Sequence, residues 1–233
     1  ALGSIELGRM ARAKGLRPLP IAGATVAAVL AISPFLARLD PALEQMPLWA
    51  IGLGLWLMLL GQAIRHRIAG AIPTLAATLL VAIFLGGFGL FAMMVRLHFS
   101  VWELALFIAA VKFTDIGAYF VGGTFGLGRT KMAPWLSPAK SWEGMAGGIV
   151  LSMGVSLAIG WSASVLGPWQ CLVFGAIMAP VGQMADMAVS LLKRDSGLKD
   201  SGSVIPGFGG LLDVLDSPLG AAPVAYLLLI WLS

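Results

Sequence analysis

Four of the eleven acidic residues in this 233-residue chain lie between positions 190 and 217, beside three of its fifteen basic residues. All four are aspartates, and a further aspartate, Asp186, lies just upstream in an apolar run. Aspartate oxygens are hard ligands that suit Mg²⁺, commonly together with substrate phosphate oxygens, and lysine and arginine neutralise phosphate charge. The combination predicts a metal-dependent phosphoryl- or nucleotidyl-transfer site, and the alternative is an ordinary basic loop with incidental acids.

The spacing of the upstream residues predicts one polar helix face. Ser190 and Lys193 follow Asp186 by four and seven residues, and Arg194 lies beside them. Residues at these intervals share a face of an α-helix. Because a charge deep in a bilayer costs a few kcal/mol or more, such a face is expected to line a cavity or meet a partner.

Asp213 and Asp216 are three residues apart and share a face if their segment is helical. The glycine-rich run 206–210 before them predicts a turn at which the backbone approaches a ligand closely. Ser217 and Pro218 equally fit the N-cap and first residue of a helix, which would leave both aspartates in a loop. The sequence leaves these two alternatives open.

A third polar group combines Lys112 with Asp115, three residues apart, in an apolar segment that continues to Tyr119. One interpretation is an internal ion pair that stabilises a helix bundle. The other is that these residues form the wall of a cavity near the substrate. Both interpretations stay open at this point.

The composition indicates the elements that must position these residues. The chain is 59% hydrophobic and 11% charged, whereas soluble domains carry about 25% charged residues. Several apolar runs approach the roughly 20 residues that span a bilayer. We therefore expect an all-α, polytopic integral membrane helical bundle of about seven transmembrane helices, forming one domain over residues 1–233, with spans near 19–37, 48–64, 72–95, 101–121, 144–162, 169–192 and 211–232.

The basic residues are divided unequally between the two sides of these spans. With the N-terminus in the cytosol, only Arg38 and Arg96 lie outside. This bias predicts that loops 122–143 and 193–210 face the cytosol and form part of the site, and it argues against nucleic acid as a partner. Twelve basic residues lie inside: Arg9, Arg12, Lys14, Arg17, Arg65, Arg67, Arg129, Lys131, Lys140, Lys193, Arg194 and Lys199.

Glycine clusters at 86–89 and 144–148 favour close helix packing in lipid over a cofactor role. The single cysteine, Cys171, cannot form an internal disulfide and is expected to pack as a small apolar residue. His66 and His98 lie far apart and show no metal-ligand spacing, so both are interpreted as interfacial residues.

Two motif blocks contain most of these polar residues. The first block comprises Asp115, Gly117, Ala118, Tyr119, Gly122, Phe125, Gly126, Ser137, Pro138, Lys140, Ser141, Glu143 and Gly144. The second comprises Ser190, Lys193, Arg194, Lys199, Asp200, Ser201, Gly202, Pro206, Gly207, Gly209, Gly210, Asp213, Asp216 and Ser217. In this order, over about residues 110–220, the two blocks closely resemble the phosphatidate cytidylyltransferase (CDP-diacylglycerol synthase) family.

The resemblance implies transfer of a cytidylyl group from CTP to phosphatidate, giving CDP-diacylglycerol and pyrophosphate in phospholipid biosynthesis. It implies Mg²⁺, with a second cation as a further candidate, and its leading ligands are Asp186 and Asp213, with Asp216 as a further ligand or a group that orients the ligands. Lys193 is expected to act with Asp186 and Asp213 in catalysis. The substrate-binding residues it implies are Ser190, Arg194, Lys199, Asp200, Lys140, Asp115, Tyr119, Gly209 and Gly210.

Four positions depart from the family pattern. Phe208 stands where histidine is usual, Val214 and Gly123 where arginine is usual, and Ala185 where glycine is usual. The retained aspartates and basic residues favour an active, divergent member. A membrane lipid or polyprenol kinase, an inactive homologue and a transporter-like scaffold are the alternative functions.

The resemblance also implies a place in the cell and an assembly. We expect a multi-pass protein of the inner (plasma) membrane whose active site faces the cytosol, with a homodimer as the candidate assembly. Family members generally have more than seven membrane helices, and this chain begins at Ala1. The chain is therefore expected to lack N-terminal helices.

Overall fold

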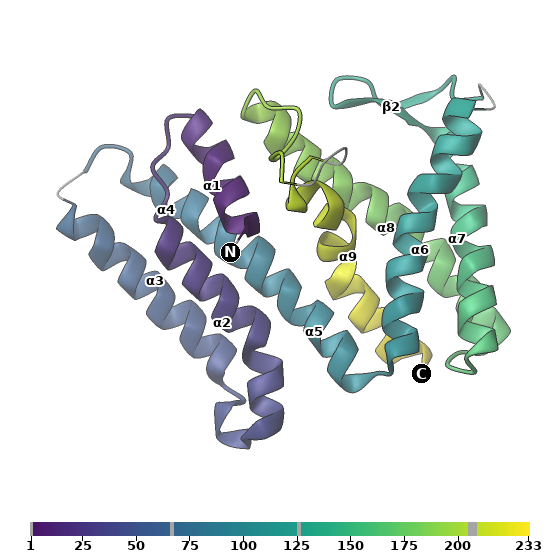
Figure 1. Cartoon of the computed structure of the whole chain (residues 1–233), viewed down its shortest axis with the longest axis horizontal. Coiled ribbons are helices and arrows are strands. Elements are labelled where there is room, and N and C mark those ends of the chain that lie inside the picture. The colour runs from purple at the N-terminus through teal and green to yellow at the C-terminus, as the bar shows by residue number, and fades with distance from the viewer. Residues whose placement is uncertain (1, 66–67, 125–126, 205–208) are drawn as a thin grey trace. The chain divides into compact units, whose positions relative to one another are not determined.

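The computed structural model describes residues 2–65, 68–124, 127–204 and 209–233. Within these ranges the chain is helical apart from one short hairpin and the connecting segments (Figure 1). Seven described helices are long and apolar enough to cross a membrane. The predicted fold class, an all-α polytopic membrane protein, is confirmed. The spans are Pro20–Leu39, Met46–Ile64, Ala71–His98, Val101–Thr124, Trp142–Ser162, Pro168–Asp195 and Leu211–Leu232.

The chain forms two compact units. One comprises Ala1–Met94 and Leu192–Leu215, and the other comprises Val95–Leu191 and Asp216–Ser233. Three helices, α5 (Phe88–His98), α8 (Pro168–Asp195) and α9 (Leu211–Leu232), contribute residues to both. The single domain expected from the sequence stays a prediction.

The first unit begins with α1 (Leu2–Ala13), which the sequence did not predict. Its spans are α2 (Pro20–Leu39), α3 (Met46–Ile64) and α4 (Ala71–Val81), the last continuing through a π-helical turn at Ala82–Gly87 into α5 (Phe88–His98). A 3₁₀ turn, Pro41–Leu43, joins α2 to α3. The predicted close packing at the first glycine cluster is confirmed, because a Cβ on Gly86 would lie 2.5 Å from the Ala27 Cα of α2.

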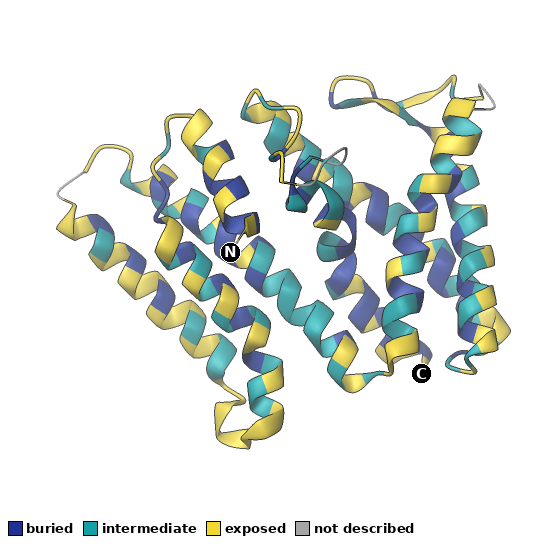
Figure 2. Cartoon of the chain, in the orientation of Figure 1, coloured by how far each residue is buried: buried dark blue, intermediate teal, exposed yellow. Residues whose placement is uncertain are grey.

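Much of α3 is exposed (Figure 2), and its exposed residues are mostly apolar. Leu48, Trp49, Leu53 and Trp56 are all more than half exposed. Only Gly54, Met58 and Gln62 of this helix are buried. A water-facing helix would carry polar residues there, so the pattern fits a helix that faces lipid.

The second unit contains α6 (Val101–Tyr119), a π-helical turn at Phe120–Thr124, and α7 (Trp142–Ser162), together with most of α8 and α9. Helices α6 and α7 pack at glycine positions, since a Cβ on Gly117 would lie 2.7 Å from the Gly147 carbonyl oxygen and one on Gly148 would lie 2.8 Å from the Thr114 carbonyl oxygen. The packing role predicted for the second glycine cluster is thereby confirmed. Cys171 is fully buried against this core.

Strands β1 (Lys131–Ala133) and β2 (Ser137–Ser141) form an antiparallel hairpin within loop 122–143. The sequence predicted no strand there. The strands have three and five residues, and β2 contains Pro138, which only an edge strand tolerates. Such short strands leave little periodic signal, and the hairpin matters because it carries Lys140.

Candidate active site

Several of the predicted site residues belong to two polar groups, one in each compact unit. The Asp213 group consists of Glu6, Lys193, Ser201, Gly210 and Asp213. The Asp186 group consists of Asp115, Lys140, Gln183, Asp186 and Asp216. Each group combines residues from separate segments of the chain.

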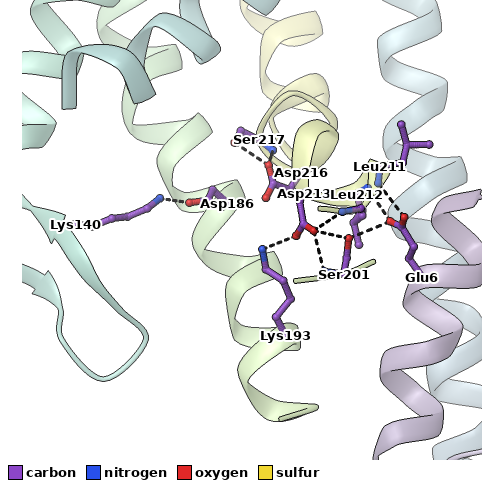
Figure 3. A network of polar contacts seen from close by, with 11 residues as sticks. Glu6, Lys140, Asp186, Lys193, Ser201, Leu211, Leu212, Asp213, Asp216 and Ser217 are labelled. Atoms are coloured by element: carbon purple, nitrogen blue, oxygen red, sulfur yellow. Dashed lines mark hydrogen bonds and ion pairs between the residues drawn. The ribbon is translucent and has the colours of Figure 1, made fainter. Parts of the chain in front are cut away.

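In the Asp213 group, both carboxylate oxygens of Asp213 accept hydrogen bonds (Figure 3). Lys193 Nζ lies 2.8 Å from Oδ1 and forms an ion pair with it. Oδ2 accepts from the Ser201 backbone N–H at 2.8 Å, the Ser201 hydroxyl at 2.9 Å and the Gly210 N–H at 2.9 Å. Because the Lys193 and Asp213 side chains are only 12% and 10% exposed, this carboxylate is a buried and fully satisfied junction.

The start of α9 explains why Asp213 reaches this junction. The helix begins at Leu211, so Asp213 is its third residue and accepts from the N–H of Gly210 immediately before the helix. An acidic residue here also lies close to the positive end of the helix dipole. Gly209 has φ +89, a left-handed conformation that favours glycine, and a Cβ on Gly210 would clash with the Ser201 hydroxyl.

Asp213 and Asp216 both lie in the helix, which decides between the two alternatives that the sequence left open. Ser217 is therefore not the N-cap residue, and Pro218 lies inside α9. Asp216 is 3% exposed, and its Oδ1 accepts from the Ser217 backbone N–H at 2.7 Å and from the Ser217 hydroxyl at 3.1 Å. The Asp216 carboxylate is thus held in place by the next residue, Ser217.

In the Asp186 group, Lys140 of the hairpin forms an ion pair with Asp186 of α8 (Figure 3). The same ammonium donates to the Gln183 carbonyl oxygen at 3.3 Å, and Gln183 Nε2 donates to Asp115 Oδ1 at 2.8 Å. The carboxyl groups of Asp186 and Asp216 are near enough to interact directly. Three carboxyl groups and one lysine therefore make up the charged part of this group.

Two residues of the first motif block hold the hairpin that carries Lys140. The Ser141 hydroxyl accepts from the Gly144 N–H at 3.1 Å and so caps the first turn of α7. Glu143 accepts from the Thr130 N–H at 3.0 Å, which ties the start of α7 to the residue before β1. Ser141 and Glu143, which follow Lys140 closely in the first motif block, thus help to fix the position of Lys140.

A cavity of about 400 Å³ opens beside this group. Asp115, Tyr119 and Lys140, all predicted site residues, lie in its wall. Lys131 of β1 adds a second ammonium, and Gln183 adds a buried amide. Among the described residues, two cationic side chains and one carboxyl group therefore face an occupant of this cavity.

The carboxyl groups fit a divalent cation only in part. No group of three or more His, Cys, Asp or Glu side chains is gathered for metal binding within the described ranges. Asp186 and Asp216 form a pair, and two carboxylates repel each other unless a cation or proton lies between them. This pair suits Mg²⁺ if substrate phosphate oxygens complete its coordination, whereas the oxygens of Asp213 are already engaged.

The remaining predicted residues lie apart from these contacts or outside the described ranges. Ser190 is partly buried on α8, whereas Arg194, Lys199 and Asp200 are exposed around the end of that helix. Tyr119 is 70% exposed. The motif positions Phe125, Gly126, Pro206, Gly207 and Phe208 lie outside the described residues, as do His66 and Arg67.

Sequence reasoning missed Glu6 and Gln183. Glu6 is 4% exposed and accepts hydrogen bonds from the first turn of α9. Glu6 could have been recognised in the sequence, because it is the only acidic residue in the first 39 positions. Gln183 also had a signal, because it is a polar residue one helical turn before Asp186 in an apolar run.

Comparisons with known proteins place this site in a family. The sequence profile of the "Cytidylyltransferase family" matches residues 1–232. A phosphatidate cytidylyltransferase of Mycobacterium bovis is 32% identical over 186 residues, covering 75% of this chain and 59% of the relative. One of Brucella suis is 38% identical over 129 residues, covering 55% and 47%, and an uncharacterised protein of Escherichia coli is 41% identical over 124 residues, covering 53% and 41%.

The chain thus spans about half the length of these curated relatives. The profile, by contrast, extends over nearly the whole chain and includes every residue of the two polar groups. The chain belongs to the cytidylyltransferase family.

Proposed function

We propose that this protein transfers the cytidylyl group of CTP to phosphatidate. The observation that carries the proposal is the convergence of Lys193, Ser201 and Gly210 on the carboxylate of Asp213 in a member of the cytidylyltransferase family. All four belong to one motif block. We infer phosphatidate as the acceptor lipid from the name of the relatives, phosphatidate cytidylyltransferase.

The proposed step is an in-line displacement at phosphorus. A phosphate oxygen of phosphatidate attacks the α-phosphorus of CTP, the bond from that phosphorus to the bridging oxygen breaks, and pyrophosphate leaves with the electron pair. The nucleophile is already an anion at neutral pH, so the step needs no strong general base. Positioning and neutralisation of charge then account for the catalysis.

The basic residues are assigned to the phosphates. Lys193 and Lys140 each meet an aspartate in the structure and would exchange part of that contact for phosphate oxygens of CTP. Arg194 and Lys199 are exposed, and we assign them to the distal phosphates. The other proposed substrate-binding residues are Ser190, Asp115, Tyr119, Asp200, Gly209 and Gly210.

The aspartates are assigned to metal. We assign Asp186, Asp213 and Asp216 as the metal ligands. The carboxyl groups of Asp186 and Asp216 interact with each other, and the oxygens of Asp213 accept hydrogen bonds that a cation would partly replace. Mg²⁺, when bound, would neutralise charge that develops on the phosphate oxygens. A second cation and a homodimer remain parts of the proposal that rest on the family resemblance.

The membrane gives both substrates access in this proposal. Phosphatidate lies in one leaflet, and CTP is a cytosolic solute. The twelve-to-two bias of basic residues favours an orientation in which loops 122–143 and 193–210 meet the cytosol. We propose that CTP enters from that side and that phosphatidate enters from the bilayer.

Two labelled forms of CTP test the reaction. With purified protein in detergent, phosphatidate and Mg²⁺, label in the α-phosphate should appear in the lipid product, and label in the γ-phosphate should appear only in pyrophosphate. A lipid kinase would instead place the γ label in the lipid, leave the α label in CDP and release no pyrophosphate. Label in neither product, from folded protein, would favour a scaffold or an inactive homologue.

A further inference from the structure

Glu6 is a buried carboxylate that belongs to neither motif block. It lies on α1 with 4% of its surface exposed. The same face of α1 buries Leu7 and Met10, so the helix is packed along the side that carries Glu6. Burying a carboxylate costs free energy unless hydrogen-bond donors satisfy it. The donors to Glu6 therefore show which part of the chain this residue fixes in place.

Three donors meet this carboxylate, and all come from the other end of the chain. Oε1 accepts from the Leu211 N–H at 2.8 Å, and Oε2 accepts from the Leu212 N–H at 2.8 Å and from the Ser201 hydroxyl at 3.1 Å (Figure 3). The N–H groups of a first helical turn have no partner inside the helix. Glu6 therefore caps α9 from α1, about 200 positions away.

The Ser201 hydroxyl connects Glu6 to Asp213. Its oxygen lies 3.1 Å from Glu6 Oε2 and 2.9 Å from Asp213 Oδ2. A serine hydroxyl has one proton to donate, so the two carboxylates compete for it. The orientation of Ser201, and with it the hydrogen bonding of Asp213, therefore depends on Glu6.

Neither Gly202 nor Gly210 has room for a side chain beside the Glu6 carboxylate. A Cβ on Gly210 would lie 2.7 Å from Glu6 Oε1, and a Cβ on Gly202 would lie 3.0 Å from the same atom. Two motif glycines are thus packed against the Glu6 carboxylate. A neighbour this close would transmit a displacement of Glu6 directly to Gly202 and Gly210.

We propose that Glu6 is a positioning residue for Ser201 and for residues 209–213, and that it acts through the Ser201 hydroxyl and the first turn of α9. The proposal rests on the proposed function, because residues 209–213 include Gly209, Gly210 and Asp213 of the candidate site. Glu6 itself needs no contact with either substrate. Its removal loosens the residues that make those contacts.

Glu6→Gln is the first test, with Glu44→Gln as the matched control. Glutamine has one carbonyl oxygen and one amide donor, so it loses at least one of the two backbone N–H contacts. We expect kcat per folded molecule to fall about 10–100-fold, as for residues that orient active-site groups. Glu44 is exposed between α2 and α3, and its substitution should leave kcat within roughly twofold.

The kinetic readout separates positioning from a purely structural role. A structural role would lower the yield of folded protein while kcat and KM of the folded fraction stay at wild-type values, and that result would overturn the proposal. Glu6→Asp provides a second variant if Glu6→Gln does not fold. It keeps the charge, but it is one methylene shorter and cannot retain all three contacts, so it too should lower kcat.

A double-mutant cycle tests the route through Ser201. If Glu6 acts through this hydroxyl, Glu6→Gln combined with Ser201→Ala should lose less activity than the product of the two single losses. Fully multiplicative losses would overturn the assigned route. Wild-type protein without CTP-dependent turnover would instead contradict the proposed function, and the two failures are therefore distinguishable.

Discussion

Lys193 Nζ lies 2.8 Å from Asp213 Oδ1, and this ion pair joins the last turn of α8 to the first turn of α9. Both side chains are about nine-tenths buried. A second lysine–aspartate pair in the same unit, Lys14 with Asp195, has a similar separation of 3.0 Å but side chains that are 47% and 62% exposed. Burial, rather than distance, sets the consequence of breaking each pair.

Lys193→Met should therefore lower stability far more than Lys14→Met. Removing one partner of a buried pair leaves an uncompensated charge and costs about 3–5 kcal/mol, whereas an exposed pair contributes about 0–1 kcal/mol. Denaturation of both variants in the same detergent measures the difference. Equal losses would show that the Lys193 pair is solvated and that the Asp213 group is not a buried junction.

Lys140→Met should reduce the use of CTP by the folded protein. Its loss removes a phosphate-binding charge from the hairpin and leaves Asp186 without its cation. Because these side chains are only 15% and 24% exposed, the variant should also lose stability, so activity is measured per folded molecule. We expect kcat/KM for CTP to fall about 10–100-fold, with Lys140→Arg retaining more activity because the charge remains. Unchanged CTP kinetics in Lys140→Met would remove this lysine from the site.

Gly117→Ala should destabilise the packing of α6 against α7. The new Cβ would lie 2.7 Å from the Gly147 carbonyl oxygen, and forcing such a contact costs about 1–3 kcal/mol. Gly154→Ala on α7 is the matched control, since its Cβ meets no atom within 4 Å and alanine favours a helix by up to about 1 kcal/mol. Thermal unfolding in detergent should show a loss for the first variant and none for the second.

Chelation of divalent cations should abolish turnover, and added Mg²⁺ should restore it. Asp186→Asn and Asp216→Asn should each raise the Mg²⁺ concentration needed for half-maximal activity by about tenfold or more, because each loses a carboxylate ligand. Asp195→Asn, at an exposed position of α8, is the control and should titrate like the wild type. Activity that survives chelation would contradict the metal assignment.

The membrane-spanning helices could be predicted from the sequence because each one is a long run of mostly apolar residues. The span expected at 211–232 agrees with α9 (Leu211–Leu232), and the others agree within a few residues. Each span is a run of about 20 or more mostly apolar residues, so contacts with the rest of the protein do not decide whether the helix forms. The close packing at Gly86 and Gly148 was predictable for a similar reason, since only a small side chain lets two helices touch.

The details of the site depended on contacts between distant positions, which one sequence does not contain. Helix α1 is short and mixed in character, and its place follows from Glu6 bonding to residues about 200 positions away. Likewise, the pairing of Lys140 with Asp186 depends on a hairpin whose strands are too short for a periodic pattern. Motif spacing identified the residues but did not identify their partners.

Pyrophosphate release by the purified protein in detergent tests the central claim most directly. CTP, phosphatidate and Mg²⁺ are supplied together, and each is then omitted in turn. The account predicts that pyrophosphate forms only when all three are present, in equal amount to CDP-diacylglycerol, and that Asp213→Asn abolishes its formation. Folded wild-type protein that releases no pyrophosphate in a suitable lipid, or releases it without phosphatidate, would contradict the claim.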